Sequence, residues 1–302
     1  MLTSRTFVVA AVAVAAAVGA LVALTQLLPG GTAARPRIQP AQVSGPPAPP
    51  PGALVLSREA GVYGVAVEIE RRSLTAIVLS PRGGGASGLR VSFLLAPGGS
   101  VRTKRCGAGC YRAAITRRPR SVRLLVAGAP PVDFAVPASA RPADAIVRRA
   151  AQTMRSLKTL VYREQLASSP TNAIVTVWKL QAPNRLAYSI DTGIAGIVVG
   201  PRRWDRSSPK QKWVESAQFP LHVMQPAWGS EAVDARLLAT GSVRGRPAWH
   251  VSFANPQIPA FFDVWIDKTT GRTLELDMTA AAHFMHHDYL RFNGPLAIRP
   301  PG

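Results

Sequence analysis

The chain has 302 residues, a formal net charge of +20 and a pI near 11.4, and most of its basic residues are arginine. Such a charge usually indicates nucleic-acid binding. Here the basic residues are scattered and form no basic helix, run or stripe interleaved with aromatic residues, so we predict no nucleic-acid partner. The charge instead predicts attraction to an anionic membrane surface, and the length allows two domains.

The first predicted element is an apolar helix over residues 7–28, in which only Thr25 and Gln26 are polar. This segment is long enough to cross a bilayer as a helix. A cleaved signal peptide is the alternative, although its apolar region is typically shorter. We favour an uncleaved signal-anchor over residues 1–28. It predicts a single-pass protein of the cell membrane, with the bulk of the chain extracytoplasmic.

Residues 29–52 form a proline-rich linker, with eight prolines among glycine, alanine and serine. This composition favours extended polyproline conformation and lacks apolar periodicity, so we expect no folded element there.

Short strands separated by turns follow, and no helix is expected among them. These strands are expected over residues 62–69, 74–79, 89–95, 113–116, 122–126 and 132–136. This pattern over residues 53–138 predicts a small, immunoglobulin-like β-sandwich.

Cys106 and Cys110 are the only cysteines, and two glycines lie between them. In an exported protein, two cysteines so close in sequence indicate a local disulfide. Paired thiolates also suit copper, so a soft-metal site is the alternative.

A single amphipathic helix begins at Pro142, with Asp144 in its first turn, where the helix dipole favours a carboxylate. Its apolar stripe consists of Ile146, Val147, Ala150, Met154 and Leu157. Ten strands are then expected, over residues 160–167, 173–181, 185–190, 194–199, 212–216, 235–242, 248–254, 261–267, 273–279 and 284–292. The fold class is therefore mainly β (α+β). Over residues 139–302 we predict a strongly curved antiparallel sheet, an unclosed β-barrel, with the helix packed in its concave face.

The order of these elements, with the motifs Gln181-Ala-Pro-Asn-Arg185, Val264-Trp-Ile-Asp267 and Thr270-Gly-Arg272, resembles the LolA/LppX-like family of outer-membrane lipoprotein carriers. The resemblance covers about residues 140–302. It implies an unclosed barrel with a helical lid whose cavity holds acyl chains, so that the partner is a lipid or a lipidated protein.

Residues 53–138, with their Cys-Gly-Ala-Gly-Cys-Tyr loop, are similar to β-sandwich extensions of actinobacterial copper-resistance proteins of the CopC/CopD type. That resemblance implies a copper-resistance membrane protein as a partner. The region contains no histidine, however, and thus departs from the copper-binding pattern of that family.

The expected ligand-binding residues are the large apolar side chains of the C-terminal strands, because aromatic and branched residues typically line acyl-chain pockets. They are Trp178, Leu180, Tyr188, Ile190, Val199, Trp213, Phe253, Phe262, Val264 and Leu276. The same residues also suit an ordinary core beneath the helix. The segment 219–228 has no clear period and is expected to form a loop at the cavity mouth.

His283, Met285 and His287 alternate along the last strand and therefore share one face, whereas His286 lies on the other. Two imidazoles and a thioether form a candidate copper site, and the alternative is an ordinary polar strand face. No catalytic motif is present, so we predict that the protein is not an enzyme. Three hypotheses remain open: a membrane-anchored lipid or lipoprotein carrier, a copper-binding accessory protein, and a structural envelope module with a filled core.

Overall fold

The computed structural model describes residues 45–302, so the predicted membrane segment and residues 29–44 of the linker lie outside the described part. Residues 45–50 carry no helix or strand, as predicted for a linker. Within this range, no helix combines the length and the apolar character that a bilayer-spanning segment needs.

Nine strands make up the N-terminal part of the described chain. They are β1 (Leu54–Ala60), β2 (Tyr63–Ile69), β3 (Ser73–Leu79), β4 (Val91–Ala96), β5 (Gly99–Arg102), β6 (Lys104–Gly107), β7 (Cys110–Ala114), β8 (Ser121–Val126) and β9 (Val132–Ala135). They form one sheet in the order β1-β2-β3-β7-β6 and a second in the order β5-β4-β8-β9. One cluster of buried side chains, including Val67, Leu74, Phe93 and Leu124, is contributed by both sheets, which therefore form a sandwich.

The predicted sandwich is present, but its topology, which strand spacing leaves open, differs from that of an immunoglobulin domain. An immunoglobulin domain places its second and third strands in different sheets, whereas β1, β2 and β3 are neighbours in one sheet here. The turns between these strands are only two or three residues long, and such short connections keep successive strands paired as hairpins. The predicted disulfide is confirmed. Cys106 and Cys110 are bonded across the β6–β7 hairpin, with their Cα atoms 5.0 Å apart.

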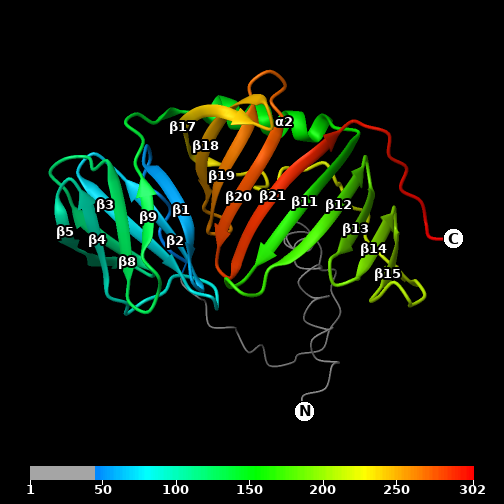
Figure 1. Cartoon of the computed structure of the whole chain (residues 1–302), viewed down its shortest axis with the longest axis horizontal. Helices are drawn as coiled ribbons and strands as arrows, with labels where there is room; N and C mark the ends of the chain where they lie inside the picture. The colour runs from blue at the N-terminus through cyan, green and yellow to red at the C-terminus, as the bar shows by residue number, and fades with distance from the viewer. Residues whose placement is uncertain (1–44) are drawn as a thin grey trace, which may run out of the picture. The chain divides into compact units, whose positions relative to one another are not determined.

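Twelve strands form the C-terminal sheet, which curves strongly without closing (Figure 1). They are β10 (Arg141–Pro142), β11 (Thr159–Ala167), β12 (Ile174–Gln181), β13 (Arg185–Ile190), β14 (Ala195–Val199), β15 (Arg202–Arg206), β16 (Val214–Ala217), β17 (Val233–Val243), β18 (Arg246–Asn255), β19 (Ala260–Asp267), β20 (Thr273–Ala280) and β21 (His283–Phe292). Their order is β10-β17-β18-β19-β20-β21-β11-β12-β13-β14-β15-β16, and all pairings are antiparallel. We call this sheet the half-barrel.

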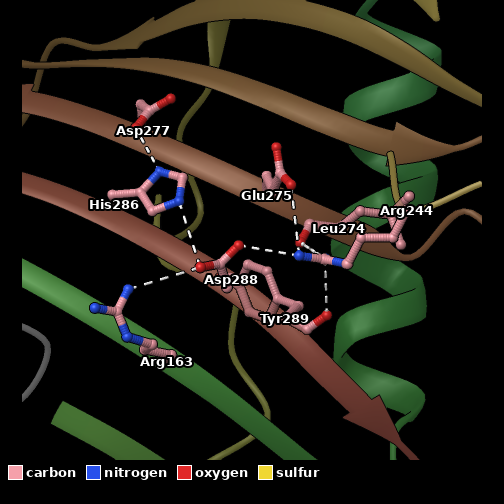
Figure 2. Close-up of polar contacts among 8 residues, drawn as sticks. All are labelled: Arg163, Arg244, Leu274, Glu275, Asp277, His286, Asp288 and Tyr289. Atoms are coloured by element: carbon pink, nitrogen blue, oxygen red, sulfur yellow. Dashed lines mark hydrogen bonds and ion pairs between the residues drawn. The ribbon is translucent and has the colours of Figure 1, made fainter. Parts of the chain in front are cut away.

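One helix, α2 (Asp144–Ser156), is found in the described residues, where the apolar stripe predicted it. Its buried residues are Val147, Ala150, Ala151 and Met154. The helix is tied to the sheet at its start and near its middle: Ala143 N donates to Ala235 O of β17, and Arg149 Nη2 donates to Thr269 O in the β19–β20 turn at 2.7 Å. In Figures 1 and 2, α2 lies behind the strands, on one face of the half-barrel only.

The sandwich packs against the half-barrel through the second face of its β1–β2–β3 sheet. Val55, Ala66 and Ile77 form one buried cluster with Ala254 and Phe261 of β18 and β19. Both faces of this sheet are therefore covered, which explains why β2 and β3 are buried along almost their whole length.

A glutamate is buried on this same face of the sandwich. Glu68 lies opposite Thr75 on β3 and is only 1% exposed. Its Oε1 atom has no hydrogen-bond partner in the part of the chain that the structure describes. Burial raises the pKa of Glu68 to about 7, although Arg112 acts in the opposite direction.

Candidate ligand-binding face

Strand register defines two faces of the half-barrel. Tyr162 on β11 lies opposite Trp178 on β12, which lies opposite Tyr188 on β13. Opposed residues point to the same side of a sheet, so the three rings lie in a row across three strands. Their centroids are 6.1 Å and 5.2 Å apart. We call this side the inner face and the other side the outer face.

The aromatic row belongs to a cluster on the inner face of the half-barrel. Around Trp178 and Tyr188, this cluster contains Tyr162, Ile174, Leu186, Ile190 and Ile194. Every member comes from β11, β12, β13 or the turn before β14. The cluster therefore comes from one continuous part of the half-barrel, and Trp178, Tyr188 and Ile190 within it are buried.

Tyr188 is held by both its ring and its hydroxyl. Its ring lies over Gly196 of β14, where a methyl group would overlap the ring atoms. Tyr188 Oη donates to Asp205 Oδ1 at 3.0 Å, and Arg203 Nη2 donates to Tyr188 Oη at 3.2 Å. Burial, followed by the charge of Asp205, raises the pKa of Tyr188 to about 12, so this phenol is neutral at physiological pH.

A buried polar group borders the aromatic row on the inner face. His287 Nε2 lies 2.8 Å from Glu164 Oε2, and His287 Nδ1 lies 3.2 Å from Tyr289 Oη. Glu164 and His287 are each 3% exposed. The Tyr162 ring lies 5.0 Å from the His287 ring. Burial and the charge of Glu164 raise the pKa of Tyr162 well above its ordinary value of 10.0.

The other half of the inner face is a filled core. Phe253, Phe262, Val264 and Leu276 share that face and are fully buried. Trp228, which is 1% exposed, packs edge-on against Phe253 with centroids 5.4 Å apart. These four predicted ligand-binding residues therefore belong to the core.

The segment 219–228, which we call the strap, covers part of this core. Val223, Met224 and Trp228 are buried, whereas Phe219 is 82% exposed. The strap is fixed to the sheet because Asn255 Nδ2 donates to Trp228 O at 2.9 Å. The strap contains no helix or strand, as predicted, but several of its side chains are buried against the core.

Two predicted ligand-binding residues do not lie on the inner face. Val199 pairs with Arg185, and its side chain points to the outer face together with Ile197. The run from Ile197 to Val199 is continuously apolar, so the sequence contains no alternation that fixes its face. Trp213 precedes β16 and stacks on Arg206 at 4.7 Å from the ring centroid to Cζ. The remaining predicted residues Trp178, Leu180, Tyr188 and Ile190 do share the inner face.

His283, Met285 and His287 share one face of β21, as the alternation predicts, because they lie opposite Ala280, Met278 and Leu276. Both ring nitrogens of His287 already contact protein partners. Among residues 45–302, no group of three or more His, Cys, Asp or Glu side chains is arranged to hold a metal ion. The copper site stays a prediction without support from this geometry.

The outer face of the same strands carries an ionic network that the sequence analysis missed (Figure 2). His286 Nδ1 lies 2.8 Å from Asp277 Oδ1, and Arg244 Nη1 lies 3.0 Å from Asp288 Oδ1 and 3.4 Å from Glu275 Oε1. The hydrogen bond to Asp277 raises the pKa of His286 above its ordinary value. The alternation of polar residues along β20 and β21 is the signal for this network.

A cavity of about 450 Å³ lies on the sandwich, beside the residue where the linker joins β1. It is lined by Gly52, Ile69, Glu70, Arg71, Arg72, Thr116, Arg117 and Arg118. Two turns meet here because Ile115 N donates to Arg72 O at 3.0 Å. Within the described residues, Arg71, Arg72 and Arg117 form no ion pair. The cavity therefore has a net positive lining.

No protein-family model matches the sequence, and no curated protein matches it significantly. Several solved structures are similar. Lipoprotein LppX of Mycobacterium tuberculosis is 12% identical, with 51% of this chain and 97% of that chain covered, at a TM-score of 0.40. LprF of Mycobacterium bovis is 11% identical, with 53% and 96% covered, at 0.40.

A LolA superfamily protein of Nitrosomonas europaea is 10% identical, with 54% of this chain and 96% of that chain covered, at a TM-score of 0.24. At these identities and TM-scores, we draw no functional conclusion from the likeness. These comparisons give no support to the predicted similarity of residues 53–138 to copper-resistance proteins.

Proposed function

We propose that the half-barrel is the binding domain of a membrane-anchored, extracytoplasmic carrier-like protein, and that its inner face holds the acyl chain of a lipid or of a lipidated protein. The observation that carries this proposal is the aromatic row of Tyr162, Trp178 and Tyr188. Its cluster comes from β11, β12, β13 and the turn before β14, whereas the strap packs on the β18 side of the same face. The LolA/LppX-like motifs of the sequence imply the same class of ligand.

The energetics of such binding are favourable. Each methylene group removed from water contributes roughly 0.8 kcal/mol, so a ten-carbon chain on this face gains about 8 kcal/mol before the costs of association. Aromatic side chains suit this task because their rigid rings offer a large apolar area with little loss of conformational freedom.

Native mass spectrometry of the full chain, purified from a bacterial envelope, tests the proposal. A bound lipid adds several hundred daltons by the weight of typical acyl lipids, and delipidation with organic solvent is expected to remove this mass. A bare protein mass in every preparation would contradict the proposal and favour the structural-module hypothesis, whereas a copper-sized increment would favour the copper alternative.

Two neighbouring substitutions on β13 localise the ligand. Leu186 points to the inner face and Ala187 to the outer face, and both side chains are partly exposed. We expect Leu186→Arg to abolish the lipid adduct because it places a charge against the acyl chain, and Ala187→Arg to retain the adduct. Equal retention by both variants would exclude the inner face as the site.

An anionic membrane surface is the second partner that we propose, through the arginine-lined cavity of the sandwich. Guanidinium groups recognise phosphate oxygens by paired hydrogen bonds, and several unpaired ones beside one cavity favour an anion. We expect the full chain in neutral detergent to bind dihexanoyl-phosphatidylglycerol and not dihexanoyl-phosphatidylcholine in calorimetry. The double variant Arg72→Ala, Arg117→Ala should lose this binding.

The matched control for that variant is Arg82→Ala, Arg90→Ala, which removes the same charge outside the cavity. If the two double variants bind the lipid equally, any loss of affinity is due to the lower net charge of the protein, and the cavity is excluded as the site.

A further inference from the structure

The indole of Trp178 carries a buried hydrogen-bond donor without an acceptor among the described residues. Its side chain is on the inner face, the residue is 8% exposed, and its Nε1 atom has no partner within residues 45–302. Trp204 provides the contrast on the outer face, where its Nε1 donates to Glu215 Oε2 at 3.0 Å. Buried N–H groups in folded proteins are nearly always paired, because an unpaired one loses the hydrogen bond that it made to water.

No acceptor among the described residues lies within hydrogen-bond distance of this N–H, and the polar groups of the inner face pair with one another instead. Glu164 and His287 pair with one another, and Tyr188 Oη donates to Asp205 while it accepts from Arg203. The rings of Tyr162 and Tyr188 flank the indole on either side. The acceptor that satisfies Trp178 therefore has to come from outside the described side chains.

The charge nearby determines the kind of acceptor. Glu164 lies opposite Thr176 on β12, two residues from Trp178 on the same face, and its negative charge extends to the neighbouring tyrosines. In a site of low dielectric constant, a second anion at this position is repelled strongly. A carboxylate or phosphate is therefore disfavoured, and a neutral oxygen acceptor is favoured.

We propose that Trp178 is a specificity-determining residue, whose Nε1–H donates to a neutral carbonyl oxygen of a ligand bound on the inner face. The ligand is thus an acyl ester or amide, with its carbonyl at the centre of the aromatic row. Its chain extends along the apolar inner-face residues of β12 and β13, on the side of Leu180 and Leu186. This inference rests on the proposed function, because it names the polar group of the same ligand.

Three probes of equal chain length test the proposal with the full chain in dilute neutral detergent. They are methyl decanoate, which has a neutral carbonyl, methyl decyl ether, which lacks it, and decanoate, which is an anion. We expect the wild type to bind the ester about five- to tenfold more tightly than the ether, as one net hydrogen bond provides. Decanoate is expected to bind more weakly than the ester.

The decisive variant is Trp178→Phe, which removes the donor and keeps an aromatic ring. We expect it to bind ester and ether with equal affinity, whereas the control Trp204→Phe keeps the ester preference because that indole lies on the outer face. Equal binding of ester and ether by the wild type, or an ester preference that survives in Trp178→Phe, would overturn the proposal while the carrier function stands. Failure of every probe to bind the wild type would overturn both.

A second measurement does not depend on the folding of the variant. With ¹⁵N-labelled tryptophan in the wild-type chain, the Nε1–H resonance of Trp178 should move downfield when the ester binds and not when the ether binds. Identical shifts with both probes would contradict the hydrogen bond.

Discussion

At the scale of single residues, the position of the Tyr188 ring requires a glycine at residue 196. The Tyr188 ring occupies the space above Gly196 of β14, and its hydroxyl donates to Asp205 of β15, the strand beyond. A side chain at residue 196 would therefore turn the ring away from β14 and break the hydrogen bond to Asp205.

We predict that Gly196→Ala lowers the free energy of unfolding by about 1–3 kcal/mol, as overpacking of a buried site typically does. It should also weaken acyl-chain binding on the inner face. Chemical denaturation followed by lipid titration measures both effects. Gly294→Ala is the control because a methyl group there meets open space. A variant as stable as this control would show that the ring has room to move.

The sequence predicts the identity of the important side chains better than their partners. Alternation correctly places Trp178 and Tyr188 on the inner face, and it correctly puts His287 on the same face as His283 and Met285. The same rule fails at Val199, where the apolar run has no alternation. The pairing of Glu164 with His287 joins residues 123 positions apart, and no local pattern contains that information.

The contact between the sandwich and the half-barrel belongs to the scale of whole elements. Gly64 of β2 faces β20 so closely that a Cβ atom at this residue would lie 2.9 Å from Ala280 O. The backbone of Gly64 faces the backbone of Ala280, and neither can shift aside as a flexible side chain could. The absence of a side chain at residue 64 therefore lets the two sheets approach.

We predict that Gly64→Val separates the two sheets locally without unfolding either part. Hydrogen exchange in β2 and β20 should then accelerate, and proteases should cut the segment between β9 and α2 faster, because local opening costs less free energy. The exchange of β12 and β13, which are remote from this contact, is the internal reference. Unchanged exchange in β2 and β20 would mean that the contact carries little stability.

Element prediction succeeds where turn residues bound an apolar strand. Strands β13 and β19 match their predicted bounds closely, since each is bounded by turn residues. Strand β15 is missed because its sequence, Arg-Arg-Trp-Asp-Arg, contains charged residues that the Arg203–Asp205 ion pair stabilises in the folded protein. The topology of the sandwich could not be predicted because strand spacing does not determine which sheet a strand joins.

At the scale of the whole molecule, the buried Glu68 makes stability depend on pH. In the folded protein Glu68 stays protonated up to about pH 7, whereas in the unfolded chain it ionises near its ordinary pKa of 4.5. The unfolded state therefore binds fewer protons between these values, and the free energy of unfolding falls as the pH rises from about 4.5 to about 7. The shift corresponds to about 3 kcal/mol.

We predict that Glu68→Gln removes most of this loss and raises the stability of the full chain above pH 7. Urea denaturation at several pH values between 4 and 8 is the measurement. His286 contributes in the same direction, since its pKa is raised and its pairing with Asp277 weakens as it loses its proton at higher pH. The same pH series for the variant His286→Gln is therefore needed to separate the contribution of His286 from that of Glu68. Parallel curves for the wild type and Glu68→Gln would contradict the role of Glu68.

The open sheet has a mechanical consequence. Strands β10 and β16 end the ladder of the described residues and do not pair with one another, so no ring of hydrogen bonds fixes the circumference. A closed barrel has a fixed circumference, whereas no hydrogen bonds between the described end strands fix the width of this sheet. If the inner face binds the ligand proposed above, we expect the edge at β13–β16 to move outward for a thicker ligand. Affinity should then vary gradually with the girth of the guest, without the sharp cut-off of a closed pore.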